Sequence, residues 1–223
     1  MKRKHRNLLV KVTTVIFITG VLSLSLGCKN ESLAATYKNK SEKQTAPTIV
    51  IYNSQAYESY KSGKKVTDIG NLLSERIDKE GMKSIFINNT ITTKDNFKTF
   101  RDYENSYNIA RTLVTQRVKD YNKCILLDIT CNKVPDKKTV ITLAKTNPHY
   151  KENKKFADSL VAQFNKLKKP ATISDWCRIN NYFNQDLSNK SIILELGDVQ
   201  STDNELNSLI NTTASALKNL NNK

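Results

Sequence analysis

From residue 48 onward, the chain alternates short aliphatic runs with longer segments that have an apolar stripe. Thr48–Tyr52 (TIVIY) is a run of the kind that forms a buried strand, and the next segment places Val66, Ile69, Leu73 and Ile77 on one helical face. The same alternation continues to the C-terminus. Strands and helices that alternate at this spacing predict an α/β fold with a single, mostly parallel or mixed sheet and helices on both faces.

The remaining elements are expected from the same two patterns. Further strands are predicted at residues 82–87, 124–129, 139–144 and 192–196. Further helices are predicted around apolar stripes at residues 103–121, 156–167 and 206–220. Gly81 supplies the end of the first helix, and Thr202 with Glu205 forms a capping box that predicts the start of the last one.

The first 28 residues predict export. Basic residues precede an uncharged run from Val12 to Leu26, and Gly27 and Cys28 follow. This is the order of a signal sequence: a basic region, an apolar region and a boundary of small residues. Two interpretations stay open, because cleavage before Cys28 with lipidation would give a lipoprotein, whereas an uncleaved segment would act as a membrane anchor. Both place the rest of the chain outside the cytoplasm, tethered to the cell membrane.

The charge of the chain bears on its partners. Residues 29–47 are rich in Lys, Asn and Ser, and we interpret them as a flexible polar stalk before a folded domain at residues 48–223. The formal net charge is +15. A basic body implies polyanionic surroundings. Because the leader directs the chain outward, we expect anionic lipid or wall polymer rather than nucleic acid.

Cysteine and histidine are scarce in this sequence. After Cys28 of the leader, Cys124, Cys131 and Cys177 remain, an odd number that leaves a bond between Cys131 and Cys177 open. The chain has no C-x-x-C pair, so a thiol-based zinc site is not predicted. One of the two histidines lies in the leader, and the other, His149, is expected at the surface where a helix starts.

Five segments together resemble a known family. They are IYNSQAYESY at residues 51–60, DYENSY at 102–107, LDITCN at 127–132, YFNQDLS at 182–188 and ILELG at 193–197. In order and spacing they are similar to the motifs H-T-H-x-x-E-S-Y, Y-N-G-S-Y, D-L-H-R-D, R-Y-N-Q-D-L-S and L-I-E-V-G of the stage II sporulation protein P family. The resemblance extends from about residue 48 to the C-terminus.

This resemblance implies a zinc-dependent N-acetylmuramoyl-L-alanine amidase, which cuts the bond between stem peptides and the glycan strand of peptidoglycan. It also implies a role in remodelling septal peptidoglycan when a sporulating cell engulfs the forespore. In such chemistry zinc acidifies a water and polarises the amide carbonyl, while a carboxylate moves the proton. The expected partners are therefore peptidoglycan stem peptides and other proteins of the sporulation septal wall.

The resemblance also shows what this sequence lacks. Asn53 and Thr130 stand where the family has metal-binding histidines, and Gln55 stands where the first motif has its second histidine. Glu58 is retained as a ligand or as support for one, and Glu195 would be the catalytic carboxylate. Because zinc hydrolases hold their metal largely through imidazole and carboxylate, we expect this chain to bind neither zinc nor another cofactor.

Other matching positions are expected to line a substrate cleft: Gln55, Tyr60, Tyr107, Asp128, Asn184, Gln185 and Asp186. A cleft shaped for a stem peptide can bind one after the metal is lost. The leading hypothesis is a degenerate amidase that binds peptidoglycan or wall-remodelling partners without hydrolysis. The alternatives are an active amidase with a non-standard metal site and a basic surface lipoprotein that binds anionic wall polymer.

Overall fold

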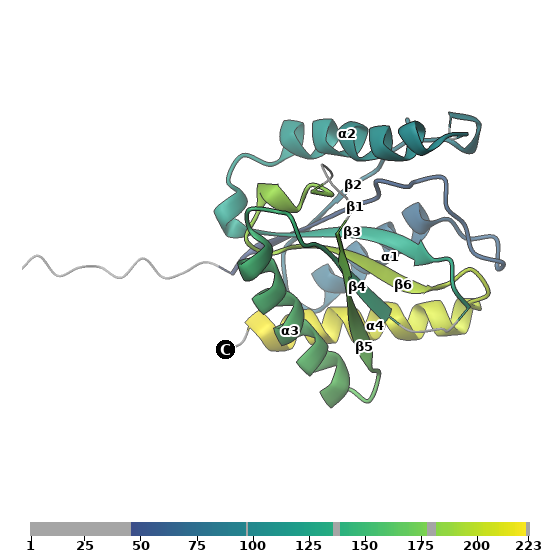
Figure 1. The fold of residues 1–223 in the computed structure, drawn as a ribbon. Helices are drawn as coiled ribbons and strands as arrows, with labels where there is room; N and C mark the ends of the chain where they lie inside the picture. Colours follow the sequence, from purple (N-terminus) through teal and green to yellow (C-terminus); the bar gives the residue numbers. More distant parts are fainter. Residues whose placement is uncertain (1–45, 97, 136–138, 178–181, 222–223) are drawn as a thin grey trace, which may run out of the picture. The chain divides into compact units, whose positions relative to one another are not determined.

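The computed structural model describes residues 46–96, 98–135, 139–177 and 182–221 (Figure 1). The export leader with Cys28, and the stalk as far as residue 45, lie outside the described residues. Within the described ranges, none of the helices combines the length and apolar character needed to cross a membrane.

Six strands form a single sheet in the order β2-β1-β3-β6-β4-β5. Their bounds are β1 Thr48–Tyr52, β2 Ser84–Ile87, β3 Cys124–Asn132, β4 Thr139–Ala144, β5 Ala171–Trp176 and β6 Ser191–Asp198. Strands β2, β1, β3 and β6 run parallel, whereas β4 is antiparallel to β6 and parallel to β5. The predicted α/β fold with one mixed sheet is confirmed.

The helices are α1 Val66–Lys79, α2 Phe100–Arg117, α3 Tyr150–Lys166 and α4 Asp203–Asn221. As predicted, Gly81 follows the end of α1 with φ +81°. The capping box before α4 is also present, because the Glu205 carboxylate accepts the Thr202 N–H at 2.8 Å and the Thr202 hydroxyl accepts the Glu205 N–H at 3.4 Å. A second box, formed by Thr99 and Asp102, starts α2.

The two faces of the sheet are covered unequally. Helices α1, α3 and α4 pack on one face, where Leu73, Phe164 and Leu194 belong to one large apolar cluster. Helix α2 lies on the opposite side (Figure 1) and contributes to a smaller cluster that joins Val114 to Val50 of β1. Among the described residues, no α-helix covers the same face of β6, β4 and β5, and part of this face is covered by the segment that contains Phe183.

Two details differ from the expected elements, and the open question of a disulfide is answered. Strand β5 was not predicted, because its pattern is polar, with Thr172, Ser174 and Asp175 exposed. Helix α2 ends at Arg117, before the end of its apolar stripe, and Tyr121 begins a short 3-10 turn instead. The cysteines Cys124, Cys131 and Cys177 are all free, so Cys131 and Cys177 form no disulfide.

Candidate functional site

A cavity of about 350 Å³ lies on the face of the sheet that α2 covers only in part. Its floor includes Thr130 of β3 and Glu195 of β6, which are direct neighbours in the parallel ladder. Aromatic side chains form much of its wall: Phe100, Tyr103 and Tyr107 of α2, Trp176 at the end of β5, and Phe183. The loop after β1 adds Gln55 and Glu58, and the end of β3 with the residue that follows it adds Cys131, Asn132 and Lys133.

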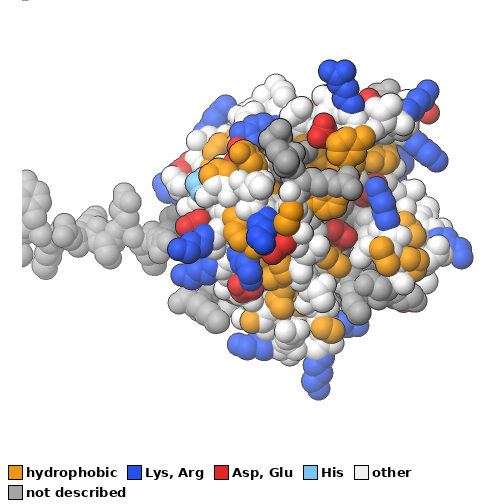
Figure 2. Space-filling model, viewed as in Figure 1, with side chains coloured by type: hydrophobic (Ala, Val, Ile, Leu, Met, Phe, Trp, Pro, Cys, Tyr) orange, Lys and Arg blue, Asp and Glu red, His pale blue; other side chains and the backbone are white. Residues whose placement is uncertain are grey.

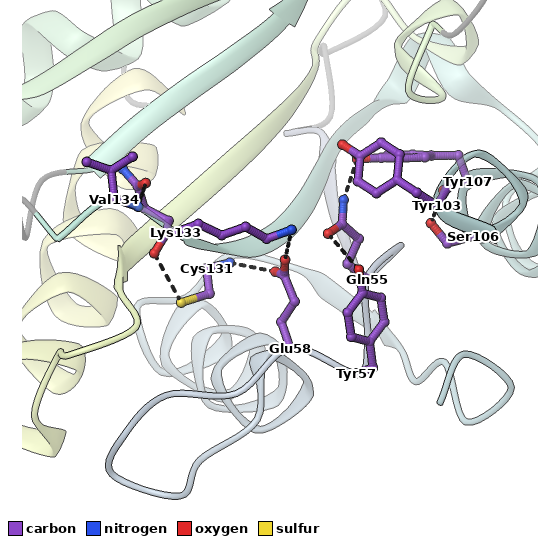
Figure 3. A network of polar contacts seen from close by, with 10 residues as sticks. Gln55, Tyr57, Glu58, Tyr103, Ser106, Tyr107, Cys131, Lys133 and Val134 are labelled. Carbon is purple, nitrogen blue, oxygen red and sulfur yellow. Dashed lines mark hydrogen bonds and ion pairs between the residues drawn. The ribbon is translucent and has the colours of Figure 1, made fainter. Parts of the chain in front are cut away.

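Glu58 is held rigidly at this cavity. It is only 9% exposed, and its Oε2 accepts the backbone N–H of Cys131 at 3.0 Å. Its Oε1 lies 3.5 Å from the Lys133 ammonium (Figure 3). Burial raises the pKa of Glu58 above its usual value, the Cys131 N–H and Lys133 oppose this rise, and the nearby Glu195 adds to it. Glu58 and Glu195 both line this cavity.

Glu195 is half-buried on the sheet floor. Its Oε1 accepts a hydrogen bond from the Thr142 hydroxyl of β4 at 2.8 Å. The parallel register of β3 and β6, together with the antiparallel pairing of β6 with β4, places Glu195 between Thr130 and the β4 strand. A strand that is apolar on both sides of this residue thus presents one carboxylate to the cavity.

Gln55 reaches the cavity from the turn after β1. Its Nε2 donates to the Tyr107 hydroxyl at 2.9 Å, and its Oε1 accepts from the Tyr57 hydroxyl at 3.4 Å (Figure 3). The Tyr107 hydroxyl is also 3.1 Å from that of Tyr103. The Gln55 amide is therefore already engaged on both of its ends by protein groups.

The structure places Asn53 outside the cavity. Its side chain is fully buried, and its Nδ2 donates to the carbonyl oxygens of Val66 at 3.1 Å and Ile129 at 2.7 Å. These bonds tie the end of β1 to the start of α1 and to β3. Of the two first-motif positions where the family has histidine, Gln55 is the one that lines the cavity.

Two more residues expected in the cleft lie in the interior instead. Tyr60 is 3% exposed, and its hydroxyl donates to the carbonyl oxygen of Leu196 at 2.8 Å. Asp128 is fully buried and its Oδ1 accepts the Ser54 N–H at 2.8 Å. Burial raises the pKa of Asp128 to about 7. Neither residue is part of the cavity lining.

Residues 182–188, which resemble the motif R-Y-N-Q-D-L-S, hold elements that form the cavity. Gln185 bonds to β4 through the Ala144 N–H and the Thr142 carbonyl, both at 2.9 Å. Asn184 donates to the carbonyl oxygen of Tyr107 at 3.0 Å, and Asp186 forms two bonds of 2.8 Å with Arg111. These three residues hold α2 and β4 in place rather than facing the cavity.

Five of the predicted site residues therefore come together at the cavity: Gln55, Glu58, Tyr107, Thr130 and Glu195. Sequence reasoning did not single out Lys133, which extends from the end of β3 toward Glu58 and lies 6.0 Å from the ring centroid of Tyr103. A basic residue directly after a strand-end motif was the available signal. It is weak, because Lys is common at the surface.

The donor set of the cavity does not fit zinc. Among the described residues that line it, none is a histidine, and His149 is the N-cap of α3. Burial, followed by the charge of Glu58, raises the pKa of Cys131 to about 12, and Cys131 belongs to the apolar cluster on the α1, α3 and α4 side of the sheet. No group of three or more His, Cys, Asp or Glu within the described part of the chain is placed to hold a metal ion.

The surface charge on the face shown in Figure 2 differs from the charge of the cavity. On the face shown in Figure 2, Lys and Arg side chains are distributed over the surface, and hydrophobic side chains gather between them. The cavity, in contrast, combines two carboxylates with a single lysine. The electrostatic potential at a ligand in the cavity would therefore differ from that at a polyanion on the outer surface.

Comparison with known proteins agrees with this fold. The CwlD amidase from Clostridioides difficile, solved in complex with the GerS lipoprotein, is similar with a TM-score of 0.50 and 16% identity over 77% of this chain and 94% of that chain. Cwp6 from Clostridium difficile is similar with a TM-score of 0.50 and 11% identity over 78% of this chain and 29% of that chain. At these identities the likeness shows a shared, amidase-like fold.

No curated protein is matched by this sequence. The family described as Stage II sporulation protein P (SpoIIP), in contrast, matches residues 25–218, which is most of the chain. The match includes the strands and loops that form the cavity. The resemblance found in the five motifs is thus confirmed, and the chain belongs to the stage II sporulation protein P family.

Proposed function

We propose that this chain is a degenerate amidase that binds peptidoglycan stem peptides, or partners in sporulation wall remodelling, without hydrolysing them. One observation supports this above all. The cavity offers an amide at Gln55 that is bonded at both ends and a hydroxyl at Thr130, at two positions where the family has histidine. These groups are poor zinc ligands, so we expect no zinc and no other cofactor.

The consequence for chemistry follows from the role of the metal. Neutral oxygen donors with carboxylates favour hard cations such as calcium or magnesium over zinc. Without a water whose pKa is brought near neutrality, several kcal/mol of transition-state stabilisation are lost. Hydrolysis of the amide by the usual route would then be negligible.

Binding does not depend on that chemistry. The Gln55, Tyr107 and Tyr103 network fixes polar groups on one wall of the cavity, and Glu58 and Glu195 are fixed on the floor. Aromatic rings supply the apolar surface. A preformed cavity with a few fixed polar groups is the usual form of a site for a small ligand or a short peptide.

The main experiment measures metal and wall cleavage together. The full chain is purified in detergent, its zinc content is determined, and its lytic activity is assayed in a gel that contains peptidoglycan. We expect peptide binding without stoichiometric zinc and without a zone of lysis. Stoichiometric zinc with lysis would support an active amidase with a non-standard metal site. Wall binding that disappears at moderate salt would instead support a basic lipoprotein that contacts anionic polymer through charge.

A designed gain of zinc binding tests the placement of the lost ligands. The double variant Gln55→His, Thr130→His adds two imidazoles beside Glu58, and we expect it to acquire measurable zinc affinity. Asn53→His is the matched control, because Asn53 is buried among backbone carbonyls away from the cavity. It should gain no zinc affinity and should destabilise the fold. Zinc binding by Asn53→His alone would contradict this assignment.

We further propose that the protein acts outside the cytoplasm, attached to the cell membrane by an uncleaved anchor or by a lipid on Cys28. The basic and apolar order of residues 1–28 supports an export signal. Mass measurement of the mature N-terminus distinguishes the two forms. A chain that starts at a lipidated Cys28 indicates a lipoprotein, an intact leader indicates an anchor, and recovery from the cytoplasm would contradict both.

A further inference from the structure

The cavity has the carboxylates expected of an amidase site but lacks the histidine nitrogens that would bind zinc. Glu58 and Glu195 both line it. A buried carboxylate is costly unless a positive group or hydrogen-bond donors compensate it. Each carboxylate accepts a hydrogen bond from the protein, and a cation other than zinc would compensate their charge further.

One such cation is already present in the protein. The Lys133 ammonium lies 3.5 Å from Glu58 Oε1 and 6.0 Å from the ring centroid of Tyr103 (Figure 3). This combination of a carboxylate and an aromatic face is a common environment for ammonium groups. Its contacts are loose, since 3.5 Å exceeds the usual length of an N–H···O bond and 67% of the Lys133 side chain is exposed. The ammonium can therefore be exchanged for another.

The carboxylates, in contrast, are fixed. The Cys131 N–H holds Glu58 Oε2 at 3.0 Å, and the Thr142 hydroxyl holds Glu195 Oε1 at 2.8 Å. A carboxylate can accept about four hydrogen bonds, so these contacts orient each group while leaving acceptor capacity for a ligand. The carboxylates of Glu58 and Glu195 are thus fixed acceptors, and the Lys133 ammonium is a mobile donor. A donor group of a ligand can take the place of this ammonium.

We propose that the cavity binds the primary ammonium group of a peptide ligand between Glu58, Glu195 and the ring of Tyr103, and that Lys133 fills this position when no ligand is bound. The inference rests on the proposed function and names the chemical group that the same cavity takes. It assigns the ligand class as a peptide with a free side-chain amine, such as a stem peptide that contains a diamino acid.

The test compares two peptides by calorimetric titration of the full chain in detergent. One is N-acetyl-L-alanyl-γ-D-glutamyl-L-lysine, and the other is the same peptide acetylated on the lysine side chain. We expect the free amine to bind at least about tenfold more tightly, in line with a charge-assisted hydrogen bond. Glu58→Gln should remove this difference. If that variant fails to fold, Glu195→Gln makes the same test.

The direction of the affinity change in Lys133→Ala is the decisive result. If Lys133 occupies the ammonium position, its removal should tighten binding of the free-amine peptide several-fold. Lys119→Ala is the matched control, because it removes one exposed positive charge from the end of α2, outside the cavity, and should leave affinity unchanged. Weaker binding in Lys133→Ala would overturn the proposal, since it would mean that Lys133 contacts an anionic group of the ligand.

The outcomes also separate this inference from the proposed function. Equal affinity for the two peptides would overturn the ammonium site while leaving peptide binding intact. Absence of binding by either peptide, together with absence of binding to purified peptidoglycan, would overturn both.

Discussion

The side of the sheet beneath α1, α3 and α4 differs from the side beneath α2 in what fills it. On the first side, buried aliphatic and aromatic side chains form one continuous cluster. On the second, two smaller apolar clusters lie beside a cavity with fixed polar groups. The difference teaches that most of the buried apolar packing lies on one face and the proposed binding cavity on the other, so substitutions on the two faces should affect different measurements.

The largest expected effect lies on the apolar face. Phe164 of α3 is fully buried in the large cluster, so Phe164→Ala should lower the free energy of unfolding by about 3–5 kcal/mol through lost burial and an empty cavity. Chemical denaturation of the purified protein measures it. Phe100→Ala on the cavity side is the control, because Phe100 is 56% exposed and should cost less than about 1 kcal/mol. Similar losses from both variants would break the comparison.

A substitution at Asp128, on the α2 side, is expected to increase stability at high pH, whereas Phe164→Ala decreases it. Because its folded-state pKa is raised from 3.8 to about 7, its contribution to stability is fully present below about pH 4 and is lost as the pH rises through 7. Asp128→Asn removes this ionisation, so it should flatten the dependence and stabilise the protein at pH 8 by up to about 4 kcal/mol.

Denaturant midpoints at pH 5 and pH 8 measure this effect. Asp158→Asn, at an exposed position of α3, is the control and should leave the difference between the two pH values unchanged. A variant Asp128→Asn that is less stable than the parent at pH 8 would show that the buried carboxylate is stabilising in its ionised form.

A smaller effect is expected at the start of α2. Thr99→Ala removes the hydroxyl that accepts the Asp102 N–H, and should cost about 1 kcal/mol of unfolding free energy. Because α2 supplies the cavity wall, the variant should also weaken peptide binding. Thr99→Ser keeps the cap and should restore both. Loss of stability without any loss of binding would mean that the wall does not depend on the helix start.

The smallest effect on stability is expected from Lys133→Ala. The ammonium is largely exposed and its contact with Glu58 is long, so the unfolding free energy should change by less than about 1 kcal/mol. Thermal unfolding measures this alongside the binding assay. A loss of several kcal/mol would mean that Lys133 is a structural partner of Glu58 rather than an exchangeable one.

The fold was largely predictable because its signals are local. The run at β1 and the capping box of α4 identify their elements without knowledge of the rest of the chain. Strand β5 was missed because it is an edge strand whose outer positions meet water, so it lacks an apolar pattern. The direction of β4, opposite to that of β3, could also have been predicted from the sequence. Only residues 133–138 separate the two strands, and these are too few for the crossover that parallel strands require.

The site was less predictable because matching a motif does not give the direction of a side chain. Asn53 and Gln55 are two positions apart and would share a face in a strand, but β1 ends at Tyr52 and the chain turns. Gln185 matches its motif yet bonds to the backbone of β4. Periodicity applies within strands and helices, whereas loop residues are placed by tertiary contacts.

The bonded pair of Gln55 and Tyr107 has a consequence for how such a sequence can change over generations. A single substitution to histidine at position 55 deprives the Tyr107 hydroxyl of its donor, and histidine at Thr130 would still be needed before an ion could be held. Under the proposed loss of hydrolysis, a return to metal binding therefore needs at least two substitutions, and the one at position 55 removes an existing hydrogen bond.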